Sequence, residues 1–373
     1  MSISKWKYWI AGGIGTLMLN GGSAFGSDFL NLCLTNHQPP AGVDVNLPED
    51  DSPKAGTPGF PVDAWAWNAH VQTLAGHDYA FGFLYLYLPF DVLVVFGNIT
   101  DVDGGSYHNQ TWATFGIPYV PTEDGYLDIR LADTPISHNA PTAKGYAGDY
   151  RVTHEIDDLK FDVTFFNLKD PIYHGGDGFL PYIDPSTGND VGSNYYYSRA
   201  RAAVVGKVTD GGKTKLVVGE GWSERQMPVA EQGDLKMFWY AIRLDNGEEI
   251  MLYDITMRQT GEQVIETGTY AFAPPFCGYE ELTGDDFEMT TEGSFISPVT
   301  GTEYPTVFHA DIPSRNTYLT LTPLLPNQEV FNTLGLFHSF YNGAATVEGT
   351  VDGQPVSGTA EIQDWIGGPP NPV

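Results

Sequence analysis

Basic residues are scarce in this chain, and their scarcity excludes one class of function. Among 373 residues there are 18 Lys and Arg against 47 Asp and Glu, which gives a formal net charge of −29. Binding to nucleic acid or to an anionic membrane depends on clustered Lys and Arg side chains. We therefore expect no nucleic-acid partner. The negative charge favours solubility and carries no information about the fold.

Charged residues of both signs are also few, at 17% of the chain, whereas hydrophobic residues reach 42% and aromatic residues 13%. A chain of this composition can bury a large core, which excludes global disorder. The 43 Gly and 26 Pro residues indicate many turns without reaching the level of a low-complexity sequence.

Long apolar runs are missing after the first 26 residues, so we expect no stable membrane span. Lys5 and Lys7 precede an uncharged stretch from Tyr8 to Leu19, and small residues follow as far as Gly26. This order is typical of a signal peptide over residues 1–26 and predicts a secreted or periplasmic protein. A membrane-spanning helix is the alternative, but the apolar run is shorter than the roughly 20 residues that it requires.

Cysteine is nearly absent, with Cys33 and Cys277 as the whole complement. In an exported chain they form either a disulfide or two half-buried thiols. The nine histidines show no ligand spacing, and Asp101–Gly105 lacks the spaced ligands of a calcium loop. We therefore expect no metal and no cofactor.

Helical periodicity over more than about ten residues is lacking, and alternation with a period of two takes its place. In Tyr79–Leu88 every odd position is aromatic and every even position is Ala, Gly or Leu, which indicates a strand covered on both faces. Turn signals at Thr209–Gly212, Asn246–Gly247 and Asp352–Gly353 separate further strands. The sequence therefore predicts an all-β fold of antiparallel barrel or sandwich type.

The length of the chain suggests two domains. The stretch Asp170–Ser193 is rich in Gly, Pro and Asp, and such long loops either are functional or connect domains. We place a boundary inside it and predict an N-terminal β domain over 63–190 and a C-terminal β domain over 191–366. Residues 27–62 are expected to form an irregular arm, and residues 367–373 a tail.

Aromatic and carboxylate side chains concentrate between Asn194 and Ile255. The candidates for chemistry and binding are Tyr195, Tyr196, Tyr197, Trp222, Glu224, Gln226, Trp239, Tyr253 and Asp254. Alternation places Asp254 on the face of Leu252 and Tyr253 on the opposite face, and both faces are largely apolar. A carboxyl group in an apolar site has a raised pKa and can act as a general acid, and aromatic faces stabilise a carbocation. The alternative is a structural network in which Tyr hydroxyls or Arg243 satisfy Asp254.

The same residues resemble a known family. The matching stretches are Trp65–His70 with Tyr79–Phe83, Tyr195–Arg201, Gly219–Gln226, Tyr253–Asp254 and Ala345–Glu361. They resemble the AttH-like, lipocalin-like family that includes carotenoid 1,2-hydratase (hydroxyneurosporene synthase) and kievitone hydratase. The fungal decalin-forming Diels–Alderases are similar in architecture. The resemblance spans nearly all of the mature chain. It implies two lipocalin-like domains packed side by side, with an apolar pocket between or within them.

Hydratases of this family protonate a carbon–carbon double bond and add water to the cation. By position, the resemblance implies that Asp254 is the acid, that Tyr253 is its neighbour, and that Trp222 with Tyr195–Tyr197 forms an aromatic wall. We add Glu224 as a second candidate for the chemistry. Trp239 and Gln226 are further candidates for substrate binding.

One stretch departs from the family pattern. Where the family usually reads Trp-x-Asp-His-Gln-Trp-Gly, this chain reads Trp222-Ser-Glu-Arg-Gln-Met-Pro228. The His and the second Trp are lost, and with them an acid–base partner and a cation-stabilising partner. This departure argues against a carotenoid substrate and leaves the implied fold intact.

Three functions remain open from the sequence. The first is a hydratase-type lyase acting on an apolar isoprenoid or prenylated substrate. The second is a pericyclase or isomerase whose pocket folds a polyene. The third is an exported carrier of apolar molecules that performs no chemistry. Conversion of a bound ligand separates the first two from the third, and incorporation of oxygen from water separates the first from the second.

Overall fold

The computed structural model describes residues 33–34, 42–43, 45–54, 59–88, 92–115, 125–131, 138–230, 233–331 and 338–365. The predicted signal peptide and tail lie outside these residues. The described part of the chain forms strands and two short 3-10 helices, η1 (Glu49–Asp51) and η2 (Pro313–Arg315). None of its helices is both long and apolar enough to cross a membrane.

The strands are β1 (Asp63–Thr73), β2 (Asp78–Leu88), β3 (Val92–Asp101), β4 (Ser106–Phe115), β5 (Tyr126–Ile129), β6 (Thr142–Tyr146), β7 (Asp149–Ile156), β8 (Leu159–Asn167), β9 (Ile172–Tyr173), β10 (Phe179–Leu180), β11 (Asn194–Asp210), β12 (Lys213–Pro228), β13 (Leu235–Leu244), β14 (Glu249–Met257), β15 (Gln263–Ala271), β16 (Tyr279–Thr283), β17 (Glu288–Glu292), β18 (Phe295–Ile296), β19 (Glu303–Tyr304), β20 (Val307–Ile312), β21 (Thr317–Pro323), β22 (Glu329–Val330), β23 (Phe340–Val351) and β24 (Gln354–Asp364).

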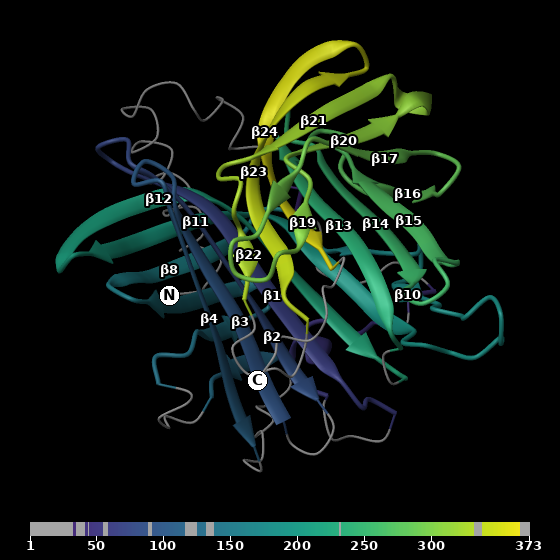
Figure 1. The fold of residues 1–373 in the computed structure, drawn as a ribbon, viewed down its shortest axis with the longest axis horizontal. Helices are drawn as coiled ribbons and strands as arrows, with labels where there is room; N and C mark the ends of the chain where they lie inside the picture. Colours follow the sequence, from purple (N-terminus) through teal and green to yellow (C-terminus); the bar gives the residue numbers. More distant parts are fainter. Residues whose placement is uncertain are drawn as a thin grey trace.

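Two curled antiparallel sheets contain nearly all of these strands (Figure 1). The larger sheet runs in the order β4-β3-β2-β1-β12-β11-β8-β7-β6-β5, and the smaller sheet in the order β16-β15-β14-β13-β24-β23-β21-β20-β17. The short strand β22 pairs with β23 and also contacts β3 and β4 of the larger sheet. The predicted all-β fold of two lipocalin-like units lying side by side is confirmed.

Strand alternation gives each sheet an inner core, as β2 illustrates. Its aromatic residues at odd positions are buried inside the larger sheet, where the rings of Phe81 and Phe161 lie 4.7 Å apart between centroids. Its even positions point outward, and Leu84 and Leu86 pack near Phe340 of the smaller sheet. The predicted strand with two covered faces is therefore confirmed. Burying one such side chain stabilises a protein by roughly 1.5–3 kcal/mol.

The same alternation operates in the smaller sheet. Tyr240 and Leu252 belong to its inner core, whereas Trp239 and Tyr253 point toward the larger sheet. We call the layer where the outward faces of the two sheets meet the seam. Its apolar part comprises Tyr196, Trp222, Trp239, Met251 and Tyr253 with their neighbours.

The predicted hairpins at Thr209–Gly212, Asn246–Gly247 and Asp352–Gly353 all join neighbouring antiparallel strands. The passage between the sheets differs from the predicted domain boundary near residue 190. Because β11 pairs with β8, and β12 pairs with β1, the chain enters the smaller sheet only between Pro228 and Leu235. The predicted loop before β11 contains β9 and β10, which both pair with β11.

The described part of the predicted N-terminal arm contributes no strand and packs against the larger sheet. Val45 and Leu47 pack with Tyr197 in a small apolar cluster. Asp51, which is 2% exposed, accepts hydrogen bonds from Tyr197 Oη at 2.6 Å and from Arg199 Nη2 at 2.7 Å. The arm is therefore held by a buried ion pair as well as by apolar contacts.

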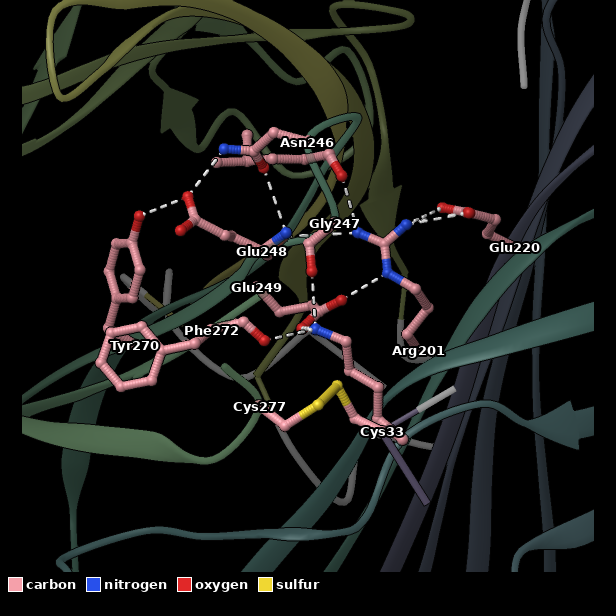
Figure 2. A network of polar contacts seen from close by, with 12 residues as sticks. Cys33, Arg201, Glu220, Asn246, Gly247, Glu248, Glu249, Tyr270, Phe272 and Cys277 are labelled. Atoms are coloured by element: carbon pink, nitrogen blue, oxygen red, sulfur yellow. Dashed lines mark hydrogen bonds and ion pairs between the residues drawn. A yellow bond between two sulfur atoms is a disulfide. The ribbon is translucent and has the colours of Figure 1, made fainter. Parts of the chain in front are cut away.

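A buried ion network joins the two sheets beside a disulfide (Figure 2). Glu249 of β14 is fully buried and binds Lys169 Nζ at 2.6 Å and Arg201 Nε. Arg201 Nη1 also contacts both carboxylate oxygens of Glu220, at 2.9 and 3.0 Å. Lys169 further donates to the carbonyl oxygens of Gly247 and Phe272, at 2.6 and 3.0 Å. Lys169 and Arg201, on the side of the larger sheet, thus share one carboxylate of the smaller sheet, that of Glu249.

Cys33 and Cys277 form a disulfide with a Cα–Cα distance of 5.6 Å, which settles the alternative left open by the sequence. Cys33 pairs with Lys169 in an isolated β-bridge, and its carbonyl oxygen accepts a hydrogen bond from the backbone N–H of Asp170 at 2.8 Å. The disulfide therefore lies next to the ion network and ties the N-terminal segment to the smaller sheet.

Glu249→Gln tests this network. The substitution leaves Lys169 and Arg201 buried without their shared carboxylate, so we expect the free energy of unfolding to fall by about 3–5 kcal/mol in urea titration. Glu155→Gln, which breaks the exposed ion pair with Lys160, is the matched control and is expected to cost at most about 1 kcal/mol. Equal losses in the two variants would contradict a dominant role for the buried network.

Candidate functional site

Glu224 is the predicted carboxylate candidate that the structure buries among aromatic side chains. It lies on β12, faces the seam and is 7% exposed. Burial raises the pKa of its carboxyl group to about 7, against the opposing effect of hydrogen-bonding groups led by Tyr196. At neutral pH a large fraction of Glu224 is therefore protonated, which is the state that a general acid requires.

Tyr196 and Trp239 hold this carboxyl group in place. Tyr196 Oη donates to Glu224 Oε2 at 2.6 Å, and Trp239 Nε1 donates to Tyr196 Oη at 2.9 Å. Trp222 and Gln226 also approach the carboxylate from the same strand face and favour its charged form. Because Tyr196 occupies Oε2, the other oxygen, Oε1, is the one that can carry the acidic proton.

Aromatic rings surround the group from both sheets. The indole rings of Trp222 and Trp239 meet edge to face at 6.4 Å, and the ring of Tyr196 lies 6.1 Å from that of Tyr253. His174 packs at 4.1 Å from the ring of Tyr196, and burial lowers its pKa to about 3, so it is neutral. Four of the candidate site residues, Tyr196, Trp222, Trp239 and Tyr253, therefore lie together with Glu224 in the seam.

The predicted wall of three consecutive tyrosines is divided by strand alternation. Only Tyr196 of the three reaches the seam. Tyr197 turns to the opposite face, where it binds Asp51, and Tyr195 packs against Phe60 and Phe179. Neighbouring residues on a strand cannot share one face, so these two tyrosines are separated from Glu224.

Asp254 does not join this group. As alternation predicted, it lies on the face of Leu252, which is the inner face of the smaller sheet and not the seam. It is only partly buried and accepts a hydrogen bond from Gln263 Nε2 at 2.7 Å. The expectation that Asp254 is buried in an apolar site is therefore wrong. Its neighbour Tyr253, on the other face, is the residue that reaches the seam.

The sequence reasoning missed Glu361, and it considered Arg243 only as a structural partner of Asp254, whereas both Glu361 and Arg243 lie in the seam. Glu361 of β24 is 2% exposed, and burial raises the pKa of its carboxyl group to about 8. Glu361 Oε1 lies 3.3 Å from the position that a Cβ atom on Gly82 of β2 would occupy, so the carboxyl group packs closely against β2. Arg243 of β13 is 1% exposed and donates from Nη1 to Asn68 Oδ1 at 3.0 Å. A signal existed for Arg243, because it is the one charged residue in the largely apolar run Phe238–Leu244 of β13. Glu361 gives no such signal, because β24 is largely polar.

A cleft of about 590 Å³ opens at one end of the seam. It lies over the same strand faces as Glu224, since Glu220, Arg243 and His70 line it. On β12, Glu220 and Glu224 are four residues apart on one face, which corresponds to about 13 Å along a strand. The described residues contain no group of three or more His, Cys, Asp or Glu side chains placed to hold a metal ion.

Comparisons with known proteins agree with this fold. The sequence profile of a family described as AttH-like matches residues 38–360. An AttH protein from Nitrosomonas europaea has a similar structure, with a TM-score of 0.70, 18% identity, and coverage of 87% of this chain and 98% of that one. Kievitone hydratase from Nectria haematococca gives a TM-score of 0.68, 16% identity, and coverage of 92% and 96%. A search of curated proteins gives no match.

Glu361→Gln tests the buried carboxyl groups through the pH dependence of stability. The folded state raises the pKa of Glu361 above its unfolded value, so its contribution to stability is complete below about pH 4.5 and is lost as the pH rises through about 8. The amide does not titrate. We expect the variant to gain on the wild type by up to about 1.4 kcal/mol for each pH unit between these limits.

Urea unfolding at several pH values measures this difference. Glu348→Gln, at an exposed position of β23, is the control and should show no such pH-dependent gain. A difference between Glu361→Gln and the wild type that stays constant with pH would contradict the raised pKa.

Proposed function

The chain belongs to the AttH-like family, and on that premise we propose that it is a hydratase-type lyase with Glu224 as its general acid. The observation that carries the proposal is a protonatable carboxyl group buried between the rings of Trp222, Trp239 and Tyr253. Kievitone hydratase, whose fold this chain shares, supports the reaction type. The substrate class that we propose is an apolar isoprenoid or prenylated molecule.

The proposed reaction adds water across a carbon–carbon double bond. The proton on Glu224 Oε1 is transferred to one alkene carbon, and the π electrons form the new C–H bond. The neighbouring carbon becomes a cation, which the faces of Trp222 and Trp239 stabilise. Water then forms the C–O bond and returns a proton to the Glu224 carboxylate. The acid is regenerated, and no other reactant is consumed.

The hydrogen-bonding neighbours have positioning roles in this scheme. Tyr196 holds Oε2, which leaves Oε1 to face the substrate, and Trp239 orients the Tyr196 hydroxyl. Gln226 lies beside the carboxylate and Tyr253 beside Tyr196, and we propose that they shape the substrate site. The cleft at Glu220 and Arg243 provides the proposed entry to the seam.

We also propose that the protein is exported. The Cys33–Cys277 disulfide supports this, because disulfides persist in oxidising compartments such as the periplasm or the extracellular space. Mass spectrometry of the protein recovered from its native host would show whether the first residues are removed.

Glu224→Gln tests the assignment of the acid. The amide keeps the size of the side chain but has no proton to transfer, so we expect kcat to fall about 100- to 10,000-fold. The assay follows incorporation of heavy oxygen from labelled water into a prenylated phenol such as kievitone, by mass spectrometry. Asp254→Asn is the matched control and should keep near wild-type turnover, because Asp254 lies on the other face of its strand.

The outcomes separate the competing functions. If Asp254→Asn were inactive and Glu224→Gln remained active, Asp254 and not Glu224 would be the acid. A product that contains no oxygen from water would support the pericyclase or isomerase alternative. A bound prenylated ligand that is never converted would support the carrier alternative.

The pH profile gives a second test of the same acid. Only the protonated form of Glu224 can donate, so we expect kcat/KM of the free enzyme to decline above about pH 7, approaching tenfold for each further pH unit. The residual activity of Glu224→Gln should be flat over this range. A wild-type profile that rises through pH 7 would exclude a carboxylic acid as the donor.

A further inference from the structure

Three cationic side chains line the cleft at the end of the seam, namely Lys169, Arg201 and Arg243. Two of them are neutralised within the network of Figure 2, where Arg201 lies between Glu220 and Glu249. Lys169 binds the second oxygen of Glu249. Two cations and two carboxylates therefore balance one another, and the third cation stands outside this group.

Arg243 is that third cation, and most of its hydrogen-bonding capacity is unused. Its side chain is 1% exposed, and Nη1 donates to Asn68 Oδ1. Nε and Nη2 are both buried, and they have no hydrogen-bond partner among the residues that the structure describes. Buried donors are normally satisfied, and a buried guanidinium without an acceptor is costly. Burial lowers the pKa of Arg243 to about 10, which still leaves it charged at neutral pH.

The charged and titratable groups around Arg243 do not replace the missing acceptor. Burial lowers the pKa of His70 to about 3, so its ring is neutral. Burial raises the pKa of Glu361 to about 8, so this carboxyl group is mostly protonated at neutral pH. Glu220 and Glu249 already bind Arg201. Among the described residues, no side chain or backbone group therefore accepts a hydrogen bond from Nε or Nη2 of Arg243, which lies at the edge of an open cleft.

The two unused groups, Nε and Nη2, form the edge of a guanidinium that binds a carboxylate through two parallel hydrogen bonds. Another arginine of this protein shows the arrangement. Arg151 donates from Nε to Asp162 Oδ1 at 2.8 Å and from Nη2 to Asp162 Oδ2 at 2.9 Å. A ligand carboxylate would thus supply the two acceptors that Nε and Nη2 of Arg243 lack.

We propose that this cleft binds an organic acid, with the ligand carboxylate on Nε and Nη2 of Arg243 and its apolar body along the cleft. Leu168 and Leu324, both half-buried, are apolar residues of the cleft lining that such a body can contact. The volume of about 590 Å³ lies within the range of small-molecule sites, roughly 300–1,000 Å³. This site concerns recognition alone and does not depend on chemistry at Glu224.

The test is calorimetric titration of the full-length protein with octanoate and, separately, with octan-1-ol, which has the same chain and no carboxylate. We expect the wild type to bind octanoate about 10- to 100-fold more tightly than the alcohol, as for a charge-assisted bidentate pair. In Arg243→Met, which keeps the volume and removes the charge, the two affinities should become equal. Absence of octanoate binding, or an unchanged preference in the variant, would overturn the proposal.

Three further variants keep the result interpretable. Should Arg243→Met not fold, Arg243→Lys retains the charge without the planar fork, and we expect at least a tenfold loss of octanoate affinity. Unchanged binding in that variant overturns the proposal. Thr359→Trp, at a half-buried residue of the cleft lining, should weaken both ligands, which locates them in the cleft. Glu224→Gln should bind octanoate as the wild type does, which separates this site from the proposed catalysis.

Discussion

The position of one sheet on the other depends on Glu249. A single buried carboxylate of β14 satisfies both Lys169 and Arg201, which follow or belong to strands of the larger sheet. Separating either cation from Glu249 would leave buried charged groups without their ion-pair partner, and their desolvation would then be uncompensated. A sliding movement of the sheets would break these contacts together, so the network fixes their register. Glu224 and Trp239, which come from different sheets, keep their separation for the same reason.

Much of the fold follows from local patterns in the sequence. Alternation in Tyr79–Leu88 and the turn at Asn246–Gly247 predict strands, faces and hairpins correctly, because both are properties of neighbouring residues. The boundary near residue 190 was not predictable in the same way. The sheet to which β11 belongs is decided by its pairing with β8 and β12, and composition does not reveal pairing partners.

The candidate site shows the same limit more sharply. Alternation correctly separated Asp254 from Tyr253, but it could not tell which of the two faces would meet the other sheet. A register shift between Arg199 and Ala202 brings both Tyr196 and Arg201 to the seam, although five residues of regular strand would place them on opposite faces. Glu361 joins Arg243 from a strand more than a hundred positions later. Only long-range packing could identify these neighbours.

The disulfide has a consequence for the order in which the molecule is completed. Its two cysteines are 244 positions apart, and the enclosed chain includes every strand from β1 to β15. Since synthesis proceeds from the N-terminus, Cys33 emerges long before its partner exists. The Cys33 thiol therefore has no intramolecular partner until most of the protein has been made. Covalent closure is thus a late event, which can occur only after β1 to β15 have been synthesised.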